Sequence, residues 1–468
     1  MRSWPGIFLA ALAAAPLSAD ALPTRPPNIL LIVTDDQNPN TIHAHGNEVI
    51  ETPHLDRLAA RGVSFTRAYA GYPICYASRA EILTGCTSFR ALPDYPKSRI
   101  APELATFAGT FREAGWHTWY VGKWHNDGHP TQRGYEQTKG LFTSGGAKGI
   151  ELPEKDERGL PLTGYRGWTF KTEDGAVDLE KGVGLTPDIS EHFGDAAVDF
   201  IESDESAQPF FLHVNFTAPH DPRLMPTGYD DRYFSAEVGL PKNFAPDHPF
   251  DHGNKGGRDE VLIPKPLQPD QVKEELAVYY AIITHIDEQI GRMMSALEAQ
   301  GLSERTLVIF TSDQGLAMGS HGLMGKQSQY EHSIRSPLII AGPQVRTGVT
   351  SPALCLLRDF FPTCCELAAI DVPETVQGRS LMPLLRGETN RVHEEVFGVF
   401  TDSQRMIAND RWKFIEYPLV NRTQLFDLQA DPFELKDLSA DPGAAEVREA
   451  LAARLRKWRI DNGDPNLP

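Results

Sequence analysis

Residues 28–36 read NILLIVTDD, a run in which five consecutive apolar side chains lead into a threonine and two aspartates. A short continuous apolar run of this kind is typical of a strand that is buried on both faces, as strands of parallel sheets are. In open α/β sheets, ligands bind beyond the carboxyl ends of such strands. The stretch therefore predicts a central strand of an α/β sheet that ends in two carboxylates, Asp35 and Asp36, at a ligand crevice.

Three later apolar runs of strand length repeat this arrangement. Each is followed within a few residues by charged, amide or imidazole side chains: 117–121 (HTWYV) by Lys123 and His125, 210–216 (FFLHVNF) by His220, and 306–310 (TLVIF) by Asp313 and Gln314. Polar residues scattered by chance would not all lie at the carboxyl ends of strands. We therefore expect these strand ends to meet at one crevice.

Helical patterns alternate with the strands. Residues 53–62, 103–114 and 270–299 carry apolar side chains at helical spacing, as amphipathic helices do. The alternation predicts the fold class α/β, with a large mixed, mostly parallel sheet sandwiched by helices. Two long segments, 142–185 and 221–266, are rich in glycine, proline and charge. Loops of this length tend to be functional, and we expect these two to rim the crevice.

The two ends of the chain differ from its centre. Arg2, the apolar run 7–17 and the small residues around Asp20 have the order of a secretory signal peptide, which predicts an exported protein, periplasmic or secreted, without a membrane anchor after cleavage. The alternative is an uncleaved anchor, but the apolar run has about half the length of a membrane span. From about Val396, short alternating runs and a helical pattern predict a small antiparallel sheet with one helix. The expected domains are a signal peptide over 1–21, a catalytic domain over 22–390 and a C-terminal α+β subdomain over 391–468.

The composition restricts the partners. A formal net charge of −18 over 468 residues argues against a nucleic-acid partner or an anionic membrane surface, because like charges repel. An anionic substrate would need positive charge that is supplied locally. The five cysteines are too few for a disulfide-stapled fold. Cys355, Cys364 and Cys365 lie in an apolar, helical stretch and are expected in the core, whereas Cys75 stands apart from them.

Four oxygen-bearing side chains, Asp35, Asp36, Asp313 and Gln314, form a candidate metal site. Carboxylate and amide oxygens suit a hard cation such as Ca²⁺, and the absence of thiolate or imidazole from this set argues against zinc. An adjacent aspartate pair at a strand end can also cap a helix or form a turn. The second pair, Asp313 and Gln314, favours the metal.

Cys75 begins a stretch, CYASRAEILTG, whose residues 77–84 have a helical pattern. The side chain at position 75 would therefore lie at a helix N-terminus, where free backbone N–H groups favour negative charge. Arg79 would lie one turn further on, close to the carboxylates. The alternatives are a buried structural thiol at Cys75 and a surface arginine at Arg79.

Basic side chains supply the local positive charge that an anion requires. Lys123 and His125 alternate along a strand end, and Lys326 lies in a glycine-punctuated loop, 321–326. His125 and His220 can serve as base and acid near neutral pH. Each lysine can alternatively be a solvated surface charge, and each histidine can be structural.

These motifs together resemble the type I sulfatase family of the alkaline phosphatase superfamily, over almost the whole chain after the leader. The resemblance rests on NILLIVTDDQ, CYASRAEILTG, GKWH, PFFLHVNFTAPH, SDQGLAMGSHGLMGK and LFDLQADPFELKDL. It implies an alkaline phosphatase-like fold and hydrolysis of a sulfate ester, on a carbohydrate, to alcohol and inorganic sulfate through a formylglycine-sulfate intermediate. A formylglycine-generating or sulfatase-maturating enzyme is the implied partner, and a sulfated small molecule or glycan is the implied substrate.

The resemblance also implies roles for individual residues. Cys75, oxidised to formylglycine, is the implied nucleophile; its hydrate has one hydroxyl to attack sulfur and a second to help expel sulfate. The implied ligands of one calcium ion are Asp35, Asp36, Asp313, Gln314 and the modified Cys75. Arg79 and His125 would tune the nucleophile, while Lys123, His220 and Lys326 would hold the sulfate and the leaving group.

Three residues depart from the family pattern. Ala77 replaces the commoner proline, Cys86 stands where a basic residue often follows Thr-Gly, and Gln314 takes a place more often held by asparagine or histidine. Two rival functions remain open at this level: a phosphodiesterase or phosphonate monoester hydrolase of the same superfamily, and an inactive sulfatase-like protein that only binds glycans. A single carboxylate cluster favours sulfate, because a dianionic phosphate monoester is better served by two metals.

Overall fold

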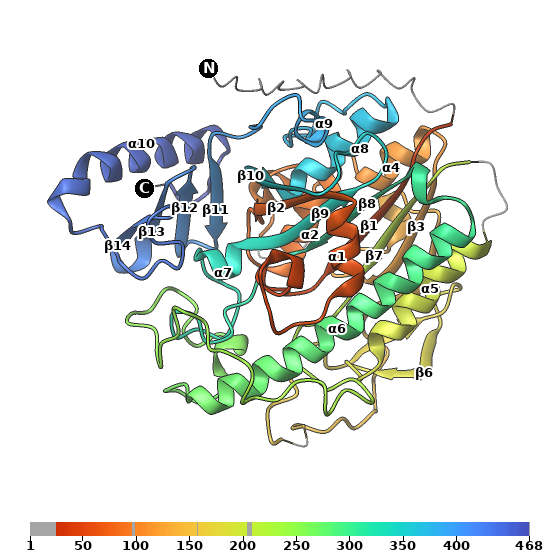
Figure 1. Cartoon of the computed structure of the whole chain (residues 1–468), viewed down its shortest axis with the longest axis horizontal. Coiled ribbons are helices and arrows are strands. Elements are labelled where there is room, and N and C mark those ends of the chain that lie inside the picture. The colour runs from red at the N-terminus through yellow and green to blue at the C-terminus, as the bar shows by residue number, and fades with distance from the viewer. Residues whose placement is uncertain (1–24, 96–98, 157, 204–207, 468) are drawn as a thin grey trace, which may run out of the picture.

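The computed structural model describes residues 25–95, 99–156, 158–203 and 208–467. They form a wide ten-stranded sheet with helices on both faces and a separate four-stranded sheet near the C-terminus (Figure 1). The strands of the large sheet are β1 (Asn28–Thr34), β2 (Gly62–Tyr69), β3 (His117–Lys123), β4 (Gln137–Ser144), β5 (Trp168–Lys171), β6 (Val177–Val183), β7 (Phe210–Asn215), β8 (Thr306–Ser312), β9 (Arg335–Ala341) and β10 (Val349–Leu356). The helices are α1 (Pro53–Ala60), α2 (Cys75–Thr84), α3 (Ser88–Ala91), α4 (Phe107–Glu113), α5 (Ile189–Ser203), α6 (Pro269–Ala299), α7 (Glu331–Ile334), α8 (Phe360–Ala368), α9 (Met382–Arg386) and α10 (Ala445–Asp461).

The large sheet is mixed, with a parallel centre. Its order is β10-β2-β9-β8-β1-β7-β3-β4-β5-β6. The neighbours β8, β1, β7, β3 and β4 run parallel, whereas β9, β5 and β6 run antiparallel to their neighbours. This confirms the predicted α/β class with a large, mostly parallel sheet between helices.

Strand β1 shows why its sequence is continuously apolar. Ile29, Leu31 and Val33 pack into one core with residues of α2, α4 and α8, and Leu30 and Ile32 pack into a second core with residues of α1, α5 and α6. All five side chains are fully buried. Figure 1 shows these two sets of helices on opposite faces of the sheet. Burial of each such side chain contributes about 1.5–3 kcal/mol.

The predicted helices are present with shifted ends. The pattern over 103–114 becomes α4, which begins at Phe107. The later start has a local cause, because the Thr106 hydroxyl accepts a hydrogen bond from the Gly109 N–H at 3.3 Å and so caps the helix. Cys355, which we expected in a helical stretch with Cys364 and Cys365, lies instead on strand β10, because the apolar run before it pairs with β2. All three thiols are buried, as expected.

The two segments expected as loops differ. The 142–185 segment holds β5 and β6, which pair as an antiparallel extension of the sheet edge. The prediction of a loop was wrong there because β6 has no buried residue, so its apolar side chains alternate with charged ones at an exposed edge and give only a weak strand signal. The 221–266 segment is irregular apart from a short 3₁₀ helix, η3 (Arg258–Val261).

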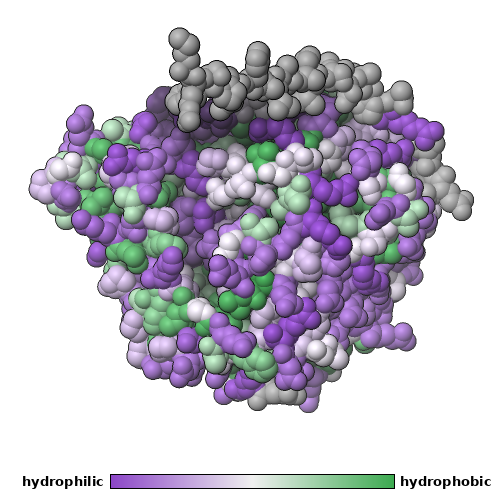
Figure 2. All heavy atoms as spheres, viewed as in Figure 1, coloured by the Kyte–Doolittle hydropathy of each residue, from purple (hydrophilic) through white to green (hydrophobic). Residues whose placement is uncertain are grey.

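The C-terminal part has the predicted antiparallel sheet and helix. Strands β11 (Val396–Phe400), β12 (Gln404–Ala408), β13 (Trp412–Tyr417) and β14 (Arg422–Asp427) pair in sequence order, and α10 packs on them. The boundary at residue 390 stays a prediction, and the expected signal peptide lies outside the described residues. Figure 2 shows a mostly hydrophilic face with small apolar groups. Among the described helices, none has the length and apolar character needed to cross a membrane.

Candidate active site

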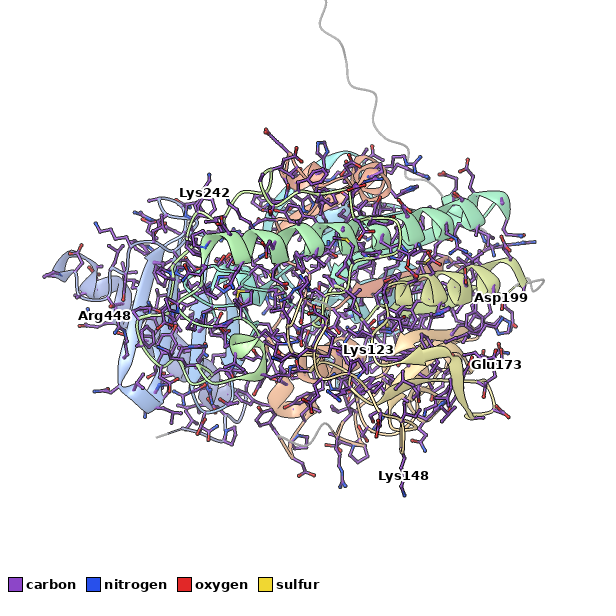
Figure 3. The ribbon with its side chains drawn as sticks, turned by 90° about the horizontal axis from the view of Figure 1, so that it is seen from below. Lys123, Lys148, Glu173, Asp199, Lys242 and Arg448 are labelled. Atoms are coloured by element: carbon purple, nitrogen blue, oxygen red, sulfur yellow. The ribbon has the colours of Figure 1, made fainter. Side chains whose placement is uncertain are left out.

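The functional crevice lies where four parallel strands end side by side. β8, β1, β7 and β3 are neighbours in that order, so the residues that follow them are brought to one edge of the sheet. Figure 3 shows Lys123, the last residue of β3, near the middle of the molecule, while Lys148, Glu173, Asp199, Lys242 and Arg448 lie toward its periphery. Positive charge is therefore present at the crevice itself, as an anionic substrate would need in a protein whose net charge is negative.

Three aspartates and Cys75 form the centre of the site. One ligand atom from each of Asp35, Asp36, Asp313 and Cys75 lies within 4.8 Å of the others. Consecutive residues of a strand point to opposite sides. The backbone of Asp36 has φ of 69°, so the chain turns there and lets both adjacent carboxylates face the same cluster. Left-handed backbone at a non-glycine residue is characteristic of strained functional sites.

Gln314 completes this cluster. Its Nε2 donates to Asp36 Oδ1 at 2.5 Å and contacts Cys75 Sγ at 3.2 Å. Its Oε1 is buried without a hydrogen-bond partner among the described residues. Buried polar atoms are nearly always paired, so an unpaired oxygen beside three carboxylates fits the role of a metal ligand.

The electrostatics of the cluster also call for a cation. Burial raises the pKa of Asp36 to about 8; the neighbouring carboxylates raise it further, and Lys326 opposes them only in part. Burial likewise raises the pKa of Asp313, against the attraction of Arg79. For Asp35, burial is outweighed by nearby positive charges, foremost Lys123, which hold its pKa well below the ordinary value. The donor set of oxygens therefore fits a hard divalent cation.

Cys75 is the first residue of α2 and is 2% exposed. Its Sγ lies 3.2 Å from Asp35 Oδ1. Burial and the negative charge of Asp35 raise the pKa of the thiol. Because the thiolate is the reactive form of cysteine, the unmodified side chain is a poor nucleophile here.

Helix α2 also positions two side chains one turn further on. The Ser78 hydroxyl donates to the Asp313 carbonyl oxygen at 2.5 Å, and Arg79 Nε donates to Asp313 Oδ2 at 2.9 Å. Arg79 Nη1 also donates to Asn215 Oδ1, at the end of β7. Arg79 is therefore a buried partner of the carboxylate cluster, and the alternative of a surface arginine does not hold.

The two predicted lysines reach the cluster from opposite sides. Lys123 Nζ lies 2.6 Å from Asp35 Oδ2, and Lys326 Nζ lies 2.6 Å from Asp36 Oδ2. Both lysines are buried, so neither is a solvated surface charge. Asp259 Oδ2, in η3, lies 3.6 Å from Lys326 Nζ. The ammonium groups are thus held next to the carboxylates by ion pairs.

Both predicted histidines lie in the same region. Burial and Lys326 lower the pKa of His220 well below its usual range, and burial and Lys123 do the same for His125. His220 Nδ1 lies 2.6 Å from the Asp221 carbonyl oxygen, so it is the protonated nitrogen of a neutral ring. Its Nε2 lies 3.7 Å from Asp36 Oδ2 and 3.1 Å from Arg258 Nη2.

Several residues of the site were missed by sequence reasoning. Tyr165 donates to Asp35, and Asn215 accepts from Arg79. Asp221, Arg258 and Asp259 surround His220 and Lys326. Asn215 and Asp221 adjoin the predicted motif at the end of β7, which was a usable signal. The other three come from the two long rim segments, whose contacts no local pattern reveals.

A mixed α/β sheet with an acidic cluster, two lysines and a nucleophile position at its carboxyl edge defines a hydrolase of the alkaline phosphatase fold. Comparison with known proteins makes this specific. The sulfatase family model matches residues 27–370, and the model of the N-sulphoglucosamine sulphohydrolase C-terminal region matches residues 319–461. The chain belongs to the sulfatase family and is a sulfatase, an enzyme that hydrolyses sulfate esters.

Named relatives and solved structures agree with this assignment. An arylsulfatase of Clostridium perfringens is 30% identical over 88% of this chain and 90% of its own length. An N-acetylglucosamine-6-O-sulfatase of Bacteroides thetaiotaomicron is 28% identical over 94% and 87%. A structure solved in complex with its substrate D-glucosamine-2-N,6-O-disulfate covers 94% of this chain and 99% of its own, with a TM-score of 0.72 at 23% identity. A phosphonate monoester hydrolase of Agrobacterium radiobacter covers 93% and 96%, with a TM-score of 0.74 at 24% identity, and so shares the fold.

Proposed function

We propose that this sulfatase hydrolyses carbohydrate sulfates with a formylglycine formed from Cys75 and with one calcium ion. The observation that carries the proposal is the place of Cys75: the first residue of a helix, 3.2 Å from Asp35 Oδ1, in a buried cluster of three carboxylates. A thiol there is protonated and inert, whereas an aldehyde hydrate offers the two hydroxyls that the reaction needs. The carbohydrate substrate is supported by the glucosamine sulfates that two related proteins act on or bind.

The calcium site would be formed by Asp35, Asp36, Asp313, Gln314 and the modified Cys75. The clustered oxygens and the unpaired Gln314 Oε1 support this set. A bound cation of this kind supplies Lewis acidity and neutralises the buried carboxylates. The alternative of an aspartate pair that caps a helix has no support, because the Asp35 and Asp36 carboxylates accept hydrogen bonds from lysine, tyrosine and glutamine side chains and from no helix N–H group of the described residues. The chain does turn at Asp36, and this turn directs both carboxylates to the cluster.

The reaction uses this chain's residues in two steps. In the first, one hydroxyl of the residue 75 hydrate would pass its proton to the Asp35 carboxylate, whose Oδ1 lies 3.2 Å from the side-chain atom of residue 75, and its oxygen would attack the sulfur while the bond from sulfur to the alcohol oxygen breaks. Lys123 and Lys326, which the ion pairs hold beside the cluster, would bind the sulfate oxygens.

His220, whose Nε2 lies 3.7 Å from Asp36 Oδ2, would deliver the proton that the departing alcohol oxygen takes up. Its ring is neutral in the described structure, so Nε2 would be protonated only in the substrate complex, where the bound anion favours the charged ring. The proton held on Asp35 would later return to His220, which resets both groups.

In the second step, the remaining hydroxyl of residue 75 loses its proton, its oxygen re-forms the aldehyde, and the bond from carbon to the sulfate oxygen breaks. His125, whose Nδ1 is buried without a partner among the described residues, would take this proton. Water then rehydrates the aldehyde. The sum is one sulfate ester and one water giving one alcohol and one hydrogen sulfate, which is a hydrolysis.

Export is the remaining part of the proposal. The leader with its small-residue cleavage site supports a periplasmic or secreted enzyme. The maturation enzyme that oxidises Cys75 and a sulfated glycan are then its partners. Five free cysteines in the chain are compatible with export, because none needs a disulfide to hold the fold.

Mass spectrometry of the peptide around Cys75 tests the proposal. Conversion of cysteine to formylglycine lowers the peptide mass by about 18 Da, because hydrogen sulfide is lost and one oxygen is gained. An active preparation with an intact thiol would sink the mechanism. Cys75→Ala should abolish turnover without loss of folded protein.

A substrate panel separates the rival functions. Aryl sulfate, aryl phosphate, phosphonate monoester and a set of sulfated sugars are compared at equal concentrations with the same matured protein. We expect the sulfate esters, and the sugar sulfates among them, to be hydrolysed with the highest kcat/KM. A higher kcat/KM for the phosphonate monoester, or binding of sugars without turnover, would contradict the proposal.

A further inference from the structure

Tyr165 is a buried residue of the site to which neither the sequence motifs nor the reaction assigns a part. It is 6% exposed, and its hydroxyl donates to Asp35 Oδ2 at 2.5 Å. Its ring centroid lies 4.6 Å from that of His220 and 4.9 Å from Lys123 Nζ. A side chain in contact with three site residues at once is well placed to control their arrangement.

The loop that carries Tyr165 is fitted closely to the site. A Cβ added to Gly164 would lie 1.9 Å from the Asp221 carbonyl oxygen, so only glycine allows this approach. The Thr163 hydroxyl donates to Asp221 Oδ2 at 3.1 Å. Tyr165 itself has a left-handed backbone with φ of 54°, which is uncommon for an aromatic residue. Tertiary contacts therefore hold this loop in a conformation that the chain would not choose locally.

The contact with Asp35 has a clear geometric effect. Asp35 Oδ2 accepts from two donors, the Tyr165 hydroxyl and Lys123 Nζ, at 2.5 and 2.6 Å. This fixes the carboxylate plane and turns Oδ1 toward Cys75 Sγ, 3.2 Å away. Groups that hold a ligand carboxylate in its orientation commonly tune metal affinity as strongly as the ligands do.

We propose that Tyr165 is a positioning residue that orients Asp35 for the cation site and for the nucleophile at position 75. This inference rests on the proposed function, because Asp35 is there a calcium ligand. The hydroxyl is the part that acts: the ring contacts would remain in phenylalanine, whereas the hydrogen bond would not. The role lies in binding the cation and aligning the nucleophile, and Tyr165 transfers no proton.

The test compares Tyr165→Phe with a matched control, Tyr135→Phe. Tyr135 is also buried, and its hydroxyl bonds to the neutral ring of His213 at 2.7 Å, away from the carboxylates. Each matured protein is stripped of metal with a chelator and dialysed, and calcium binding is measured by isothermal titration calorimetry. We expect Tyr165→Phe to weaken calcium binding about 10- to 100-fold and Tyr135→Phe to leave it within about twofold.

Turnover of an aryl sulfate over a range of free calcium gives a second readout. For Tyr165→Phe, the calcium concentration at half-maximal activity should rise by the same factor, and kcat should recover largely at saturating calcium. Unchanged calcium affinity in Tyr165→Phe, with a parent that binds calcium and cleaves sulfate esters, overturns this inference alone. A parent that cleaves sulfate esters without binding calcium overturns both the inference and the calcium site of the proposed function.

Discussion

At the scale of single residues, the site places like charges together in a region without solvent. Asp35, Asp36 and Asp313 are at most 1% exposed. Their repulsion is countered in the described structure by Lys123, Lys326 and Arg79. A buried charge that loses its partner costs several kcal/mol. The same arrangement makes the cluster attractive to a divalent cation and sensitive to any change of charge.

Asp313→Asn separates the roles of charge and shape. The amide keeps the size of the side chain but removes one of three repelling charges. We expect the metal-free variant to melt at or above the temperature of the metal-free parent, while kcat/KM for sulfate esters falls at least about 100-fold. Calorimetric melting and turnover after chelation and calcium readdition measure both effects. Full activity of the metal-free parent would show that the cation plays no part in catalysis.

His220 and His125 should differ in how they depend on the leaving group. If His220 protonates the alcohol oxygen, His220→Ala should reduce kcat/KM about 100-fold or more for a sugar sulfate and far less for an aryl sulfate with an acidic phenol. His125→Ala should depress both substrates alike, because it acts on the sulfated intermediate. The measurement is kcat/KM and burst amplitude over leaving groups of graded acidity. If kcat/KM of His220→Ala depends on leaving-group acidity as it does in the parent, His220 does not act as the acid and only binds sulfate.

At the scale of elements, the rim segment 221–266 is joined to the loop that carries Lys326. The Glu260 carboxylate accepts hydrogen bonds from the Met324 and Gly325 N–H groups at 2.8 and 2.9 Å. Glu260 is 2% exposed, so these two N–H groups have no access to water there. Burial raises the pKa of this carboxyl group, with the two N–H donors opposing the shift. A segment with little secondary structure thereby fixes the loop that carries Lys326.

Glu260→Ala tests this connection. It leaves two buried N–H groups without acceptors, which costs about 1–3 kcal/mol for each group. We expect a lower melting temperature and a raised KM for sulfate esters, because the Lys326 loop loses its support. Glu304→Ala is the control, since Glu304 pairs with Arg61 at the surface and its side chain is 92% exposed. An unchanged KM in Glu260→Ala would show that Lys326 needs no support from the rim.

The rim also marks the limit of what the sequence predicts. NILLIVTDD and the three other strand ends carry their own signal, because a buried parallel strand must be apolar throughout and its polar residues then fall at one edge. Tyr165 and Arg258 carry no such signal. Their places follow from the packing of long irregular segments against the sheet, for example the approach of Gly164 to Asp221. The strand β6 was missed for a related reason, because its alternating apolar residues, Val177 and Leu179, are exposed at the sheet edge and are interspersed with charged residues and glycine.

At the scale of the whole molecule, the C-terminal sheet is tied to the catalytic part by buried charge. Lys413 Nζ, on β13, lies 2.9 Å from Glu331 Oε1 on α7 and 2.9 Å from Glu434 Oε1. Beside them lie three buried histidines, His248, His252 and His332, and the partly buried His321, from the rim, α7 and the Lys326 loop. Removal of the C-terminal sheet would leave Glu331 buried without its lysine. The two parts should therefore unfold together.

The histidine group predicts a loss of stability in acid. Burial lowers the pKa of His248 to about 4, of His252 to about 3 and of His321 to about 4, against an ordinary value near 6.5. At pH values between these lowered pKa values and 6.5, the three histidines are protonated in the unfolded chain but neutral in the folded protein. Stability therefore falls as the pH is lowered from about 6.5 to 4, by up to about 1.4 kcal/mol per pH unit for each histidine.

A substitution of one histidine separates its contribution to the acid slope from that of groups with the opposite pH dependence. Burial raises the pKa of Asp287 and of Glu434 to about 7, and these carboxyl groups favour the folded state in acid. We therefore expect His252→Phe to flatten the acid slope of the unfolding free energy while changing stability little at pH 8. Urea unfolding at several pH values, parent against variant, measures the slope. Parallel curves for the two proteins would contradict the assignment to His252.

The burial of Cys75 has a consequence for the order of events in the life of the chain. Its side chain is 2% exposed and contacts Asp35, from an earlier part of the sequence, and Gln314, from a much later part. Another enzyme must surround this side chain to oxidise it, and the finished fold offers no such access. The proposed conversion of Cys75 would therefore have to precede folding, and the active fraction would depend on the rate of modification relative to the rate of folding. Protein that folds first should stay a thiol, and added maturation enzyme should convert it only after denaturation.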